Sequence, residues 1–360
     1  MRLSDKQLRR RLVMSWMVAL TMVVFLIPLV PQAVSLSQAQ TETRESTKPV
    51  TVPNPGTDLW REVRQREGKV TGTTQMRNMD AGVLINVDGQ KWRQYRMSTL
   101  LPYSAVLLLV VIGAIYLYWR NRGPIKIDAG RSGKAVPRFS YNQRVAHWTV
   151  AILFVTLGIT GVIMLYGRFI IKPIFGQTLF GYLGAVAKTL HDFAGPLFAI
   201  ALIVQFVLFV RGNGFNPKVD VEWLKHGGGM LKKDHVHAGC YNAGEKLWFW
   251  LAMIGGAFII ISGLVLDFPY FNQDRAMLEL NHMLHSIFAV CVLAVSLGHI
   301  YLGTKGMEGA FEIMVTGYCD ENWAKEHHDL WYEDMKKAGK VINASEVPKR
   351  GSSGRTITDP

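Results

Sequence analysis

The sequence predicts an all-α integral membrane protein, and three observations support that prediction. Hydrophobic residues make up 49% of the 360 residues, and the mean hydropathy is +0.15. These residues are concentrated in a few long blocks, as in membrane proteins, rather than spread evenly along the chain. The net charge is +13, and the basic residues cluster beside the apolar blocks. That placement is explained by the positive-inside rule, so we expect no nucleic-acid partner.

The N-terminus is typical of a secretory signal over residues 1–39. A basic region precedes the apolar stretch 12–30, and Ser37-Gln-Ala39 offers a cleavage site flanked by small residues. The apolar stretch is long for a signal, so an uncleaved anchor is the alternative. Both interpretations place residue 40 outside the cytoplasm. Residues 40–97 are then a periplasmic segment, too short to form a sizeable core of its own.

Five apolar blocks follow, each close to the roughly 20 residues that a helix needs to cross a bilayer. They are Ser98–Trp119, Val145–Tyr166, Leu190–Val210, Leu247–Phe268 and His282–Gly303. Between the first two, the segment 120–144 carries seven basic residues and one acidic residue, so we place it in the cytoplasm. The remaining connections then alternate, with 167–189 and 269–281 as external loops and 211–246 inside.

These assignments predict a four-helix bundle with one additional N-terminal transmembrane helix. The expected parts are a signal at 1–39, a periplasmic segment at 40–97, transmembrane helix 1 at 98–120, a cytoplasmic loop at 121–144, the four-helix domain at 145–304 and a cytoplasmic tail at 305–360. The charged tail is expected to form an amphipathic helix. Cys240, Cys291 and Cys319 form no C-x-x-C motif, which argues against an Fe–S cluster or a covalently attached c-type haem.

Two histidines of the last apolar block are in register on one helix face. His285 and His299 are 14 residues apart. At about 100° per residue that is only ~40° short of four full turns, and at ~1.5 Å per residue it is ~21 Å along the axis. His282 is a rival for the outer position, but the same arithmetic turns it ~100° away from this face. We therefore expect His282 to be an interfacial residue.

Two further membrane histidines match these in depth. Given the orientation, His147 lies near the cytoplasmic side with His299, and His191 lies near the outer side with His285. Neutral imidazole is a standard axial ligand of haem iron, so the four histidines predict two b-type haems at different depths. A single histidine in a membrane is as often a hydrogen-bonded helix contact, but four that match in depth and face are hard to obtain by chance. Five glycines allow either close approach to a macrocycle or helix packing. They are Gly158, Gly161, Gly195, Gly255 and Gly256.

Several motifs resemble one family. They are Arg144-Val-Ala-His-Trp-Thr-Val150, Leu190-His-Asp-Phe-Ala-Gly195, Leu284-His285 with His299, Tyr241-Asn-Ala-Gly-Glu-Lys246, Lys305-Gly-Met-Glu-Gly309, and Trp323-Ala-Lys-Glu-His-His328 with Trp331-Tyr332. Over about residues 138–335 the chain resembles the gamma (cytochrome b) subunit of quinone-linked formate dehydrogenases. The N-terminal signal and additional helix resemble the longer form of that subunit.

The resemblance implies a site for each cofactor. It implies that His147 and His299 ligate the haem b on the cytoplasmic side, and that His191 and His285 ligate the outer haem b. It also implies that Asn242, Gly244 and Glu245 lie near a quinone (menaquinone or ubiquinone) beside His299. The shorter members have Gln at the position of Glu245, so the role of this carboxylate is open, with proton delivery as one option.

The resemblance also implies partners and a location. An alpha subunit would oxidise formate at a molybdenum or tungsten site and a beta Fe–S subunit would pass electrons to this chain, which holds no formate-oxidising residues. The chain would be a multi-pass protein of the bacterial inner membrane, in contact with lipid, with a cytoplasmic C-terminus. The alternatives are the b-type cytochrome of a hydrogenase or of another respiratory dehydrogenase or reductase, and a haem-free membrane anchor or transporter.

Overall fold

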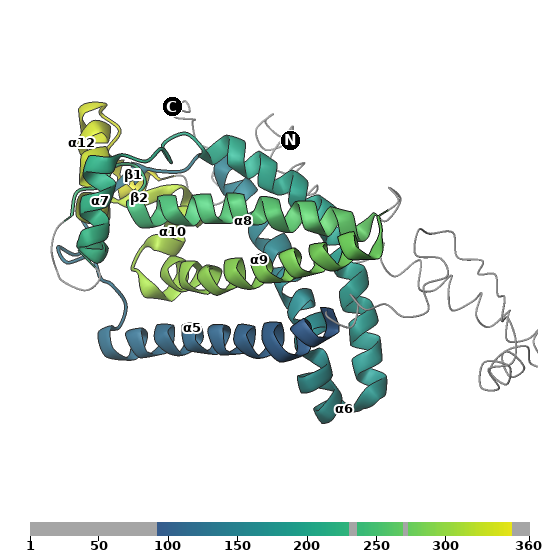
Figure 1. Cartoon of the computed structure of the whole chain (residues 1–360). Coiled ribbons are helices and arrows are strands. Elements are labelled where there is room, and N and C mark those ends of the chain that lie inside the picture. The colour runs from purple at the N-terminus through teal and green to yellow at the C-terminus, as the bar shows by residue number, and fades with distance from the viewer. Residues whose placement is uncertain (1–91, 230–235, 269–272, 348–360) are drawn as a thin grey trace, which may run out of the picture.

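The structure is a computed structural model that describes residues 92–229, 236–268 and 273–347. The predicted signal at 1–39 and nearly all of the predicted periplasmic segment lie outside the described residues. The described chain is a bundle of long helices with a small cap of short helices and strands at one end (Figure 1). Four of its helices are long and apolar enough to cross a membrane. The chain is therefore a multi-pass, mainly helical membrane protein, as predicted.

The first described helix runs along one side of the bundle. Helix α5 (Leu101–Arg122) continues a π-helical turn, Arg96–Leu100, so the helix begins inside the segment predicted as periplasmic. Its outer face is apolar, with Tyr103 71% exposed and Leu109 68% exposed, as expected of a surface that faces lipid. Its inner face packs against α9 (Arg275–Tyr301).

Helix α6 (Tyr141–Phe209) contains two of the predicted spans. A straight helix of 69 residues would be about 100 Å long, far more than the roughly 30 Å of a bilayer core. The chain reverses at Gly176, whose φ of 85° favours glycine, and two arms result, 141–175 and 177–209 (Figure 1). The predicted external loop 167–189 is thus wrong as a loop, because helical hydrogen bonds continue on both sides of Gly176 and satisfy the backbone.

Helix α8 (Ala243–Asp267) packs closely against α9. A Cβ atom on Gly255 would lie 2.6 Å from Cγ2 of Val292 on α9. A Cβ atom on Gly256 would lie 2.6 Å from Cδ2 of Leu202 on α6. These two glycines therefore serve helix packing, whereas a Cβ on Gly195 would meet nothing within 4 Å.

The cap joins segments that are far apart in sequence. Its antiparallel sheet has the order β2-β1-β3, with β1 Lys134–Pro137, β2 Tyr318–Asp320 and β3 Ile342–Asn343. Its helices are α7 Pro217–Lys225, α10 Ala310–Thr316, α11 Glu321–His327 and α12 Asp329–Lys337. Val136 is fully buried in a core that includes Trp323 and Tyr332. From the sequence we expected only a loop and an amphipathic helix here. Strands this short form by pairing with segments that are distant in the chain, so no local pattern indicates them.

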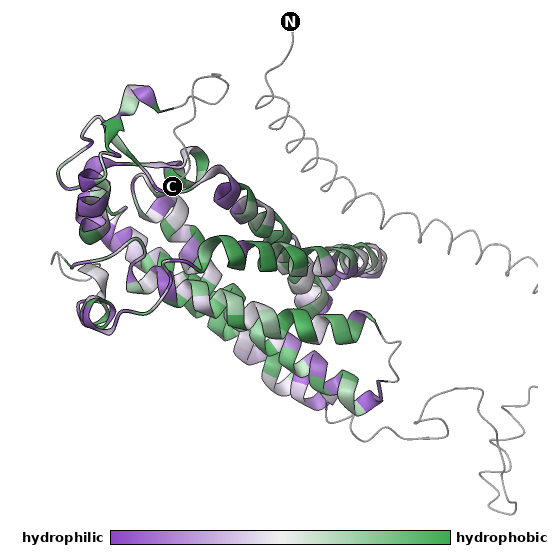
Figure 2. Cartoon of the chain, turned by 90° about the horizontal axis from the view of Figure 1, so that it is seen from above, coloured by the Kyte–Doolittle hydropathy of each residue, from purple (hydrophilic) through white to green (hydrophobic). Residues whose placement is uncertain are grey.

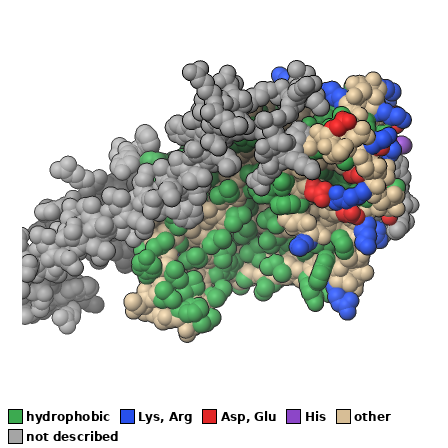
Figure 3. Space-filling model, turned by 180° about the vertical axis from the view of Figure 1, so that it is seen from behind, with side chains coloured by type: hydrophobic (Ala, Val, Ile, Leu, Met, Phe, Trp, Pro, Cys, Tyr) green, Lys and Arg blue, Asp and Glu red, His purple; other side chains and the backbone are tan. Residues whose placement is uncertain are grey.

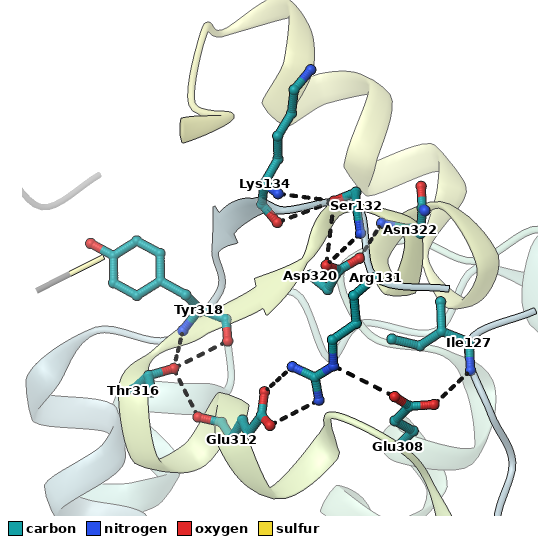
Figure 4. A network of polar contacts seen from close by, with 10 residues as sticks. All are labelled: Ile127, Arg131, Ser132, Lys134, Glu308, Glu312, Thr316, Tyr318, Asp320 and Asn322. Carbon is teal, nitrogen blue, oxygen red and sulfur yellow. Dashed lines mark hydrogen bonds and ion pairs between the residues drawn. The ribbon is translucent and has the colours of Figure 1, made fainter. Parts of the chain in front are cut away.

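Polar contacts hold the segment 123–133 against the tail (Figure 4). The Arg131 guanidinium donates two hydrogen bonds to Glu312, at 2.8 and 2.9 Å, and lies 3.5 Å from Glu308. The Ser132 amide donates to the Asp320 carboxylate at 3.0 Å. Each exposed ion pair of this kind contributes at most about 1 kcal/mol, so the network fixes position more than it adds stability.

The surface separates into an apolar region and a charged end. Figure 2 shows hydrophobic residues along the middle of the long helices and hydrophilic residues concentrated in the cap. On the face drawn in Figure 3, apolar side chains cover the helices, and Lys, Arg, Asp and Glu gather at the cap end. The bundle therefore matches the bilayer interior, and the cap matches an aqueous compartment.

Candidate functional site

One pair of histidines lies at the cap end of the bundle. His147 is near the start of α6 and His299 is near the end of α9, and their ring centroids are 6.2 Å apart with an interplanar angle of 63°. The Trp248 indole stacks on the His299 imidazole at 4.8 Å. Trp148, beside His147, donates from Nε1 to the Met314 carbonyl in the cap at 3.1 Å. The cap and α8 together position this inner pair.

A second pair lies toward the other end. His191, on the second arm of α6, and His285, on α9, have ring centroids 6.1 Å apart with an interplanar angle of 69°. His191 Nδ1 is 2.8 Å from the Thr160 hydroxyl, which itself donates to the Thr156 carbonyl. With its proton donated to that carbonyl, the Thr160 hydroxyl accepts from a protonated Nδ1 of His191. His285 Nδ1 likewise donates to the Ile259 carbonyl at 2.9 Å.

These hydrogen bonds leave Nε2 of each outer histidine as the nitrogen with a lone pair. A metal ligand of this type normally has its second ring nitrogen held by a carbonyl or hydroxyl, which fixes the tautomer and the ring orientation. Partners from α6 and α8 supply this support: Thr160 for His191, and Ile259 with the Ser262 hydroxyl at 3.2 Å for His285. No pattern in the sequence indicated these partners.

The separation of the rings fits bis-histidine ligation. Imidazole binds a first-row metal at about 2 Å, and a ring nitrogen lies about 1 Å from its centroid, so two axial imidazoles have centroids roughly 6 Å apart. Both pairs match this separation. Within the described residues, the buried Nδ1 of His147 has no hydrogen-bond partner. The open space beside Gly195 also suits a flat macrocycle. The residues present therefore fit two haem groups, and their ligation of iron stays a prediction.

A cavity of about 1420 Å³ adjoins the inner pair. Both His147 and His299 line it, together with apolar side chains of α6, α8 and α9. Asn242, Gly244 and Glu245, the residues predicted to lie near a quinone, line the same cavity at the start of α8. The structure thus brings all three predicted quinone residues together with the inner histidines, in a space large enough for an organic ligand.

The three residues at the start of α8 also have structural roles. Asn242 Oδ1 accepts from the Glu245 amide at 2.9 Å, and the Glu245 carboxylate accepts from the Asn242 amide at 3.0 Å. This reciprocal pair is a capping box. A Cβ atom on Gly244 would lie 2.8 Å from the Trp223 ring, so close packing also requires glycine there.

Two further charged or titratable side chains meet Glu245; the sequence did not single out Arg138, and it indicated His328 only as part of a tail motif. Arg138 Nη2 lies 3.1 Å from Glu245 Oε1, and the Arg138 side chain is only 1% exposed. His328 is equally buried; its Nδ1 donates to the Gly239 carbonyl at 2.8 Å, and its Nε2 is 3.7 Å from Glu245. Burial, together with the positive charge of Arg138, lowers the pKa of His328 well below its ordinary value.

The sequence signal for Arg138 was misleading for a physical reason. An arginine just before an apolar span is explained by the positive-inside rule, so it was counted only as one of the seven basic residues of the segment 120–144. The fold instead places it under the cap, between β1 and α6. Only the tertiary packing of the cap shows that this charge is buried.

Comparison with known proteins identifies related chains. Residues 138–317 match the family described as prokaryotic cytochrome b561. The cytochrome b556(fdo) subunit of formate dehydrogenase from Escherichia coli K12 is 29% identical over 207 residues, which cover 56% of this chain and 94% of the relative. The nitrate-inducible cytochrome b556(Fdn) subunit from the same strain is 30% identical over 211 residues, 57% and 94% respectively. The Haemophilus influenzae cytochrome b556 subunit is 29% identical over 197 residues, 53% and 79% respectively.

Proposed function

Because the chain belongs to the prokaryotic cytochrome b561 family, we propose that it is the dihaem cytochrome b subunit of a formate dehydrogenase complex. The observation that supports this most directly is the presence of two histidine pairs, at opposite depths of one bundle, with ring separations of 6.1 and 6.2 Å. His191 and His285 would hold the outer haem b, and His147 and His299 the inner one.

The two haems would supply one-electron redox chemistry. The residues of this chain would position them: Thr160 and the Ile259 carbonyl fix the outer imidazoles, and Trp248 fixes the plane of His299. The apolar core of the bundle would keep water away from the haems. Inward movement of an electron against the membrane field stores about 2.3 kcal/mol per charge per 100 mV.

The remaining chemistry would lie on partners. A periplasmic alpha subunit with molybdenum or tungsten would oxidise formate, and a beta Fe–S subunit would deliver the electrons to the outer side of this chain. The family names of the relatives support that assignment, since each is a cytochrome subunit of formate dehydrogenase. The bacterial inner membrane, with residues 40–97 in the periplasm and the cap in the cytoplasm, is the compartment in which this arrangement works.

The cavity beside the inner pair would be the quinone site. Asn242, Gly244 and Glu245 line it next to His299, and menaquinone or ubiquinone would be the electron acceptor. Reduction of a quinone to a quinol consumes two electrons and two protons. Glu245 lies between the cavity and the cap, so it is placed to pass protons from cytoplasmic water to the reduced ring.

Optical spectra of histidine variants test the proposal. The purified chain should show b-type α-bands, and His285→Ala should remove the contribution of one haem while the other remains. His282→Ala is the matched control on the same helix, because His282 stacks on Trp92 and does not face His191. A wild-type chain with no haem bands, or a His285→Ala variant that keeps both, would contradict the proposal.

Electron donors separate formate dehydrogenase from the related alternatives. Membranes that contain the assembled complex should reduce the haems with formate and not with hydrogen. Co-purification followed by subunit identification should recover an Fe–S subunit and a molybdenum or tungsten subunit. Reduction by hydrogen alone would assign the chain to a hydrogenase instead.

A further inference from the structure

Arg138 is a buried cation held rigidly beside the cavity. Its guanidinium carbon lies 5.0 Å from the ring centroid of Trp323, 5.3 Å from that of Phe139 and 5.4 Å from that of Trp331. Cation–π contacts of this kind attract a guanidinium that has left water. Because Nη2 pairs with Glu245, the guanidinium has few other orientations available to it.

The second terminal nitrogen of this guanidinium, Nη1, points to a missing hydrogen-bond acceptor. Within the described part of the chain, the buried Nη1 of Arg138 has no hydrogen-bond partner. A buried donor on a charged group is destabilising when it is left unsatisfied, so such groups nearly always have a partner. Arg138 lines the cavity that also contains Asn242, Gly244 and Glu245. A ligand in this cavity that carries an acceptor oxygen would satisfy Nη1.

We propose that Arg138 donates a hydrogen bond from Nη1 to an oxygen of the quinone head group and stabilises the negative charge that this oxygen gains on reduction. The inference rests on the proposed function, which places a quinone in the cavity. When two electrons enter the quinone, charge develops on its two oxygens until two protons arrive from water. A fixed guanidinium beside one oxygen stabilises that charge without having to reorganise.

The charge balance of the cluster favours a quinone over a haem propionate as the partner. Glu245 already supplies one carboxylate to Arg138, at 3.1 and 3.2 Å. A propionate on the same guanidinium would bring a second negative charge close to Glu245, and like charges at such distances repel. A quinone carbonyl is neutral when it binds. Neutral His328 does not add a compensating cation, because its pKa is lowered.

Quinone binding to Arg138 variants tests this role. Wild type, Arg138→Gln and Arg138→Lys would be purified as the full chain, and decylubiquinone and menadione would be titrated by tryptophan-fluorescence quenching, which the nearby Trp248 and Trp223 should report. Arg138→Gln should bind at least about 10-fold more weakly, since hydrogen bonds to charged groups contribute about 1.5–3 kcal/mol. Arg138→Lys should retain part of the affinity. Both haem spectra should be unchanged.

Controls separate this inference from folding effects and from the proposed function. Arg131→Gln is the matched control, because Arg131 is exposed and, among the described residues, pairs with Glu308 and Glu312 of the cap network; it should bind both quinones as wild type does. If Arg138→Gln fails to assemble because Glu245 is left unpaired, the double variant Arg138→Gln with Glu245→Gln removes both charges. That double variant should assemble and should bind both quinones more weakly than Glu245→Gln alone, which keeps Arg138.

Three results would overturn the assignment of Arg138. Arg138→Gln could bind both quinones within twofold of wild type, with both haems present; that result counts against Arg138 and leaves the proposed function intact. Arg138→Gln could instead lose or shift the inner haem spectrum while it binds quinone normally, which would make a haem propionate the partner. A wild-type chain that carries no haem or binds neither quinone would contradict the proposed function itself, and the role of Arg138 with it.

Discussion

At the scale of single residues, the two histidine pairs are supported by different means. In the outer pair, Nδ1 of each histidine donates a hydrogen bond to an oxygen acceptor. In the inner pair, the Trp248 indole instead stacks on the ring of His299. A hydrogen bond on Nδ1 raises the basicity of the ligating nitrogen, and stacking does not. The two sites should therefore differ in haem affinity and in reduction potential, which single substitutions can measure.

Thr160→Val tests the support of the outer site. Loss of the hydroxyl leaves Nδ1 of His191 without its acceptor, and the loss of such partners typically costs 10- to 100-fold in metal affinity. We expect lower haem occupancy at the outer site and a changed midpoint potential, with the inner haem unaffected. Thr156→Val is the control, because the Thr156 side chain donates only to the Ile152 carbonyl of its own helix. Redox titration followed by α-band absorbance measures both quantities, and equal behaviour of the two variants would contradict the role of Thr160.

His328 predicts a pH dependence of cap stability. Its folded-state pKa is lowered by burial and by Arg138, so below its unfolded pKa of about 6.5 the unfolded cap binds the proton and the folded cap does not. The free energy of unfolding should therefore fall as the pH drops through about 6.5, by up to about 1.4 kcal/mol per pH unit. Hydrogen exchange of residues 310–345 at pH 7.5 and 5.5 measures this change.

A substitution at the same position provides the control for that pH effect. His328→Gln keeps a side-chain donor for the Gly239 carbonyl and removes the titration. Exchange rates in this variant, corrected for intrinsic chemistry, should change less between the two pH values than in wild type. If both proteins show the same change, His328 is not the group that sets the pH dependence of the cap.

The placement of single side chains could be predicted from the sequence where it depended only on the periodicity of one helix. The spacing of His285 and His299 placed both on one face, and the structure has them opposite His191 and His147. Arg138 could not be found in this way, because its burial depends on a cap built from three distant segments. The acceptor for His191 was also not predictable, since a threonine inside an apolar helix usually bonds to its own backbone.

At the scale of elements, the helices were predictable and their connections were not. Apolar length predicted five spans, and the structure has helix over each of them, yet the two arms of α6 continue to Gly176 without an intervening loop. The cap sheet pairs Val136 with Cys319, a contact that no local pattern indicates. Burial there raises the pKa of Cys319 to about 12, so this thiol is protonated and inert at neutral pH.

The junction of α7 and α8 depends on one buried ion pair. Lys246 Nζ donates to both oxygens of Asp220 at 2.9 Å, and the two side chains are 9% and 1% exposed. Asp220→Asn leaves a buried ammonium without its partner, so we expect a loss of about 3–5 kcal/mol. The loss should appear as release of α7, measured by limited proteolysis and by thermal unfolding of the purified chain.

Two variants control for that ion pair. Glu222→Gln, on the exposed face of α7, disrupts only surface contacts to Lys225 and His226 and should change the stability by less than about 1 kcal/mol. Combining Asp220→Asn with Lys246→Met removes both buried charges and should restore much of the stability. If the double variant is as unstable as Asp220→Asn alone, the packing shape of Asp220 matters more than its charge.

At the scale of the whole molecule, the division into bundle and cap fixes which end meets which compartment. Both histidine pairs lie within the bundle, and the cavity joins the inner pair to the cap. Electrons that enter at the far end would thus reach a site that can take protons through the cap. Reversal of the chain in the membrane would place the quinone chemistry on the opposite side and remove the charge separation, so orientation decides whether the complex stores energy.

Labelling of single cysteines tests that orientation directly. Lys337→Cys in the cap and Lys172→Cys near the turn of α6 both introduce thiols at exposed positions, at opposite ends of the bundle. A membrane-impermeant maleimide should label Lys172→Cys in intact spheroplasts and Lys337→Cys only in inverted vesicles, because the positive-inside rule predicts that the basic segment 120–144, and the cap with it, faces the cytoplasm. The unsubstituted chain reports any labelling of the native thiols. The reverse pattern would place the inner histidines and the cavity on the periplasmic side, and electron transfer from a periplasmic donor to quinone would then generate no membrane potential.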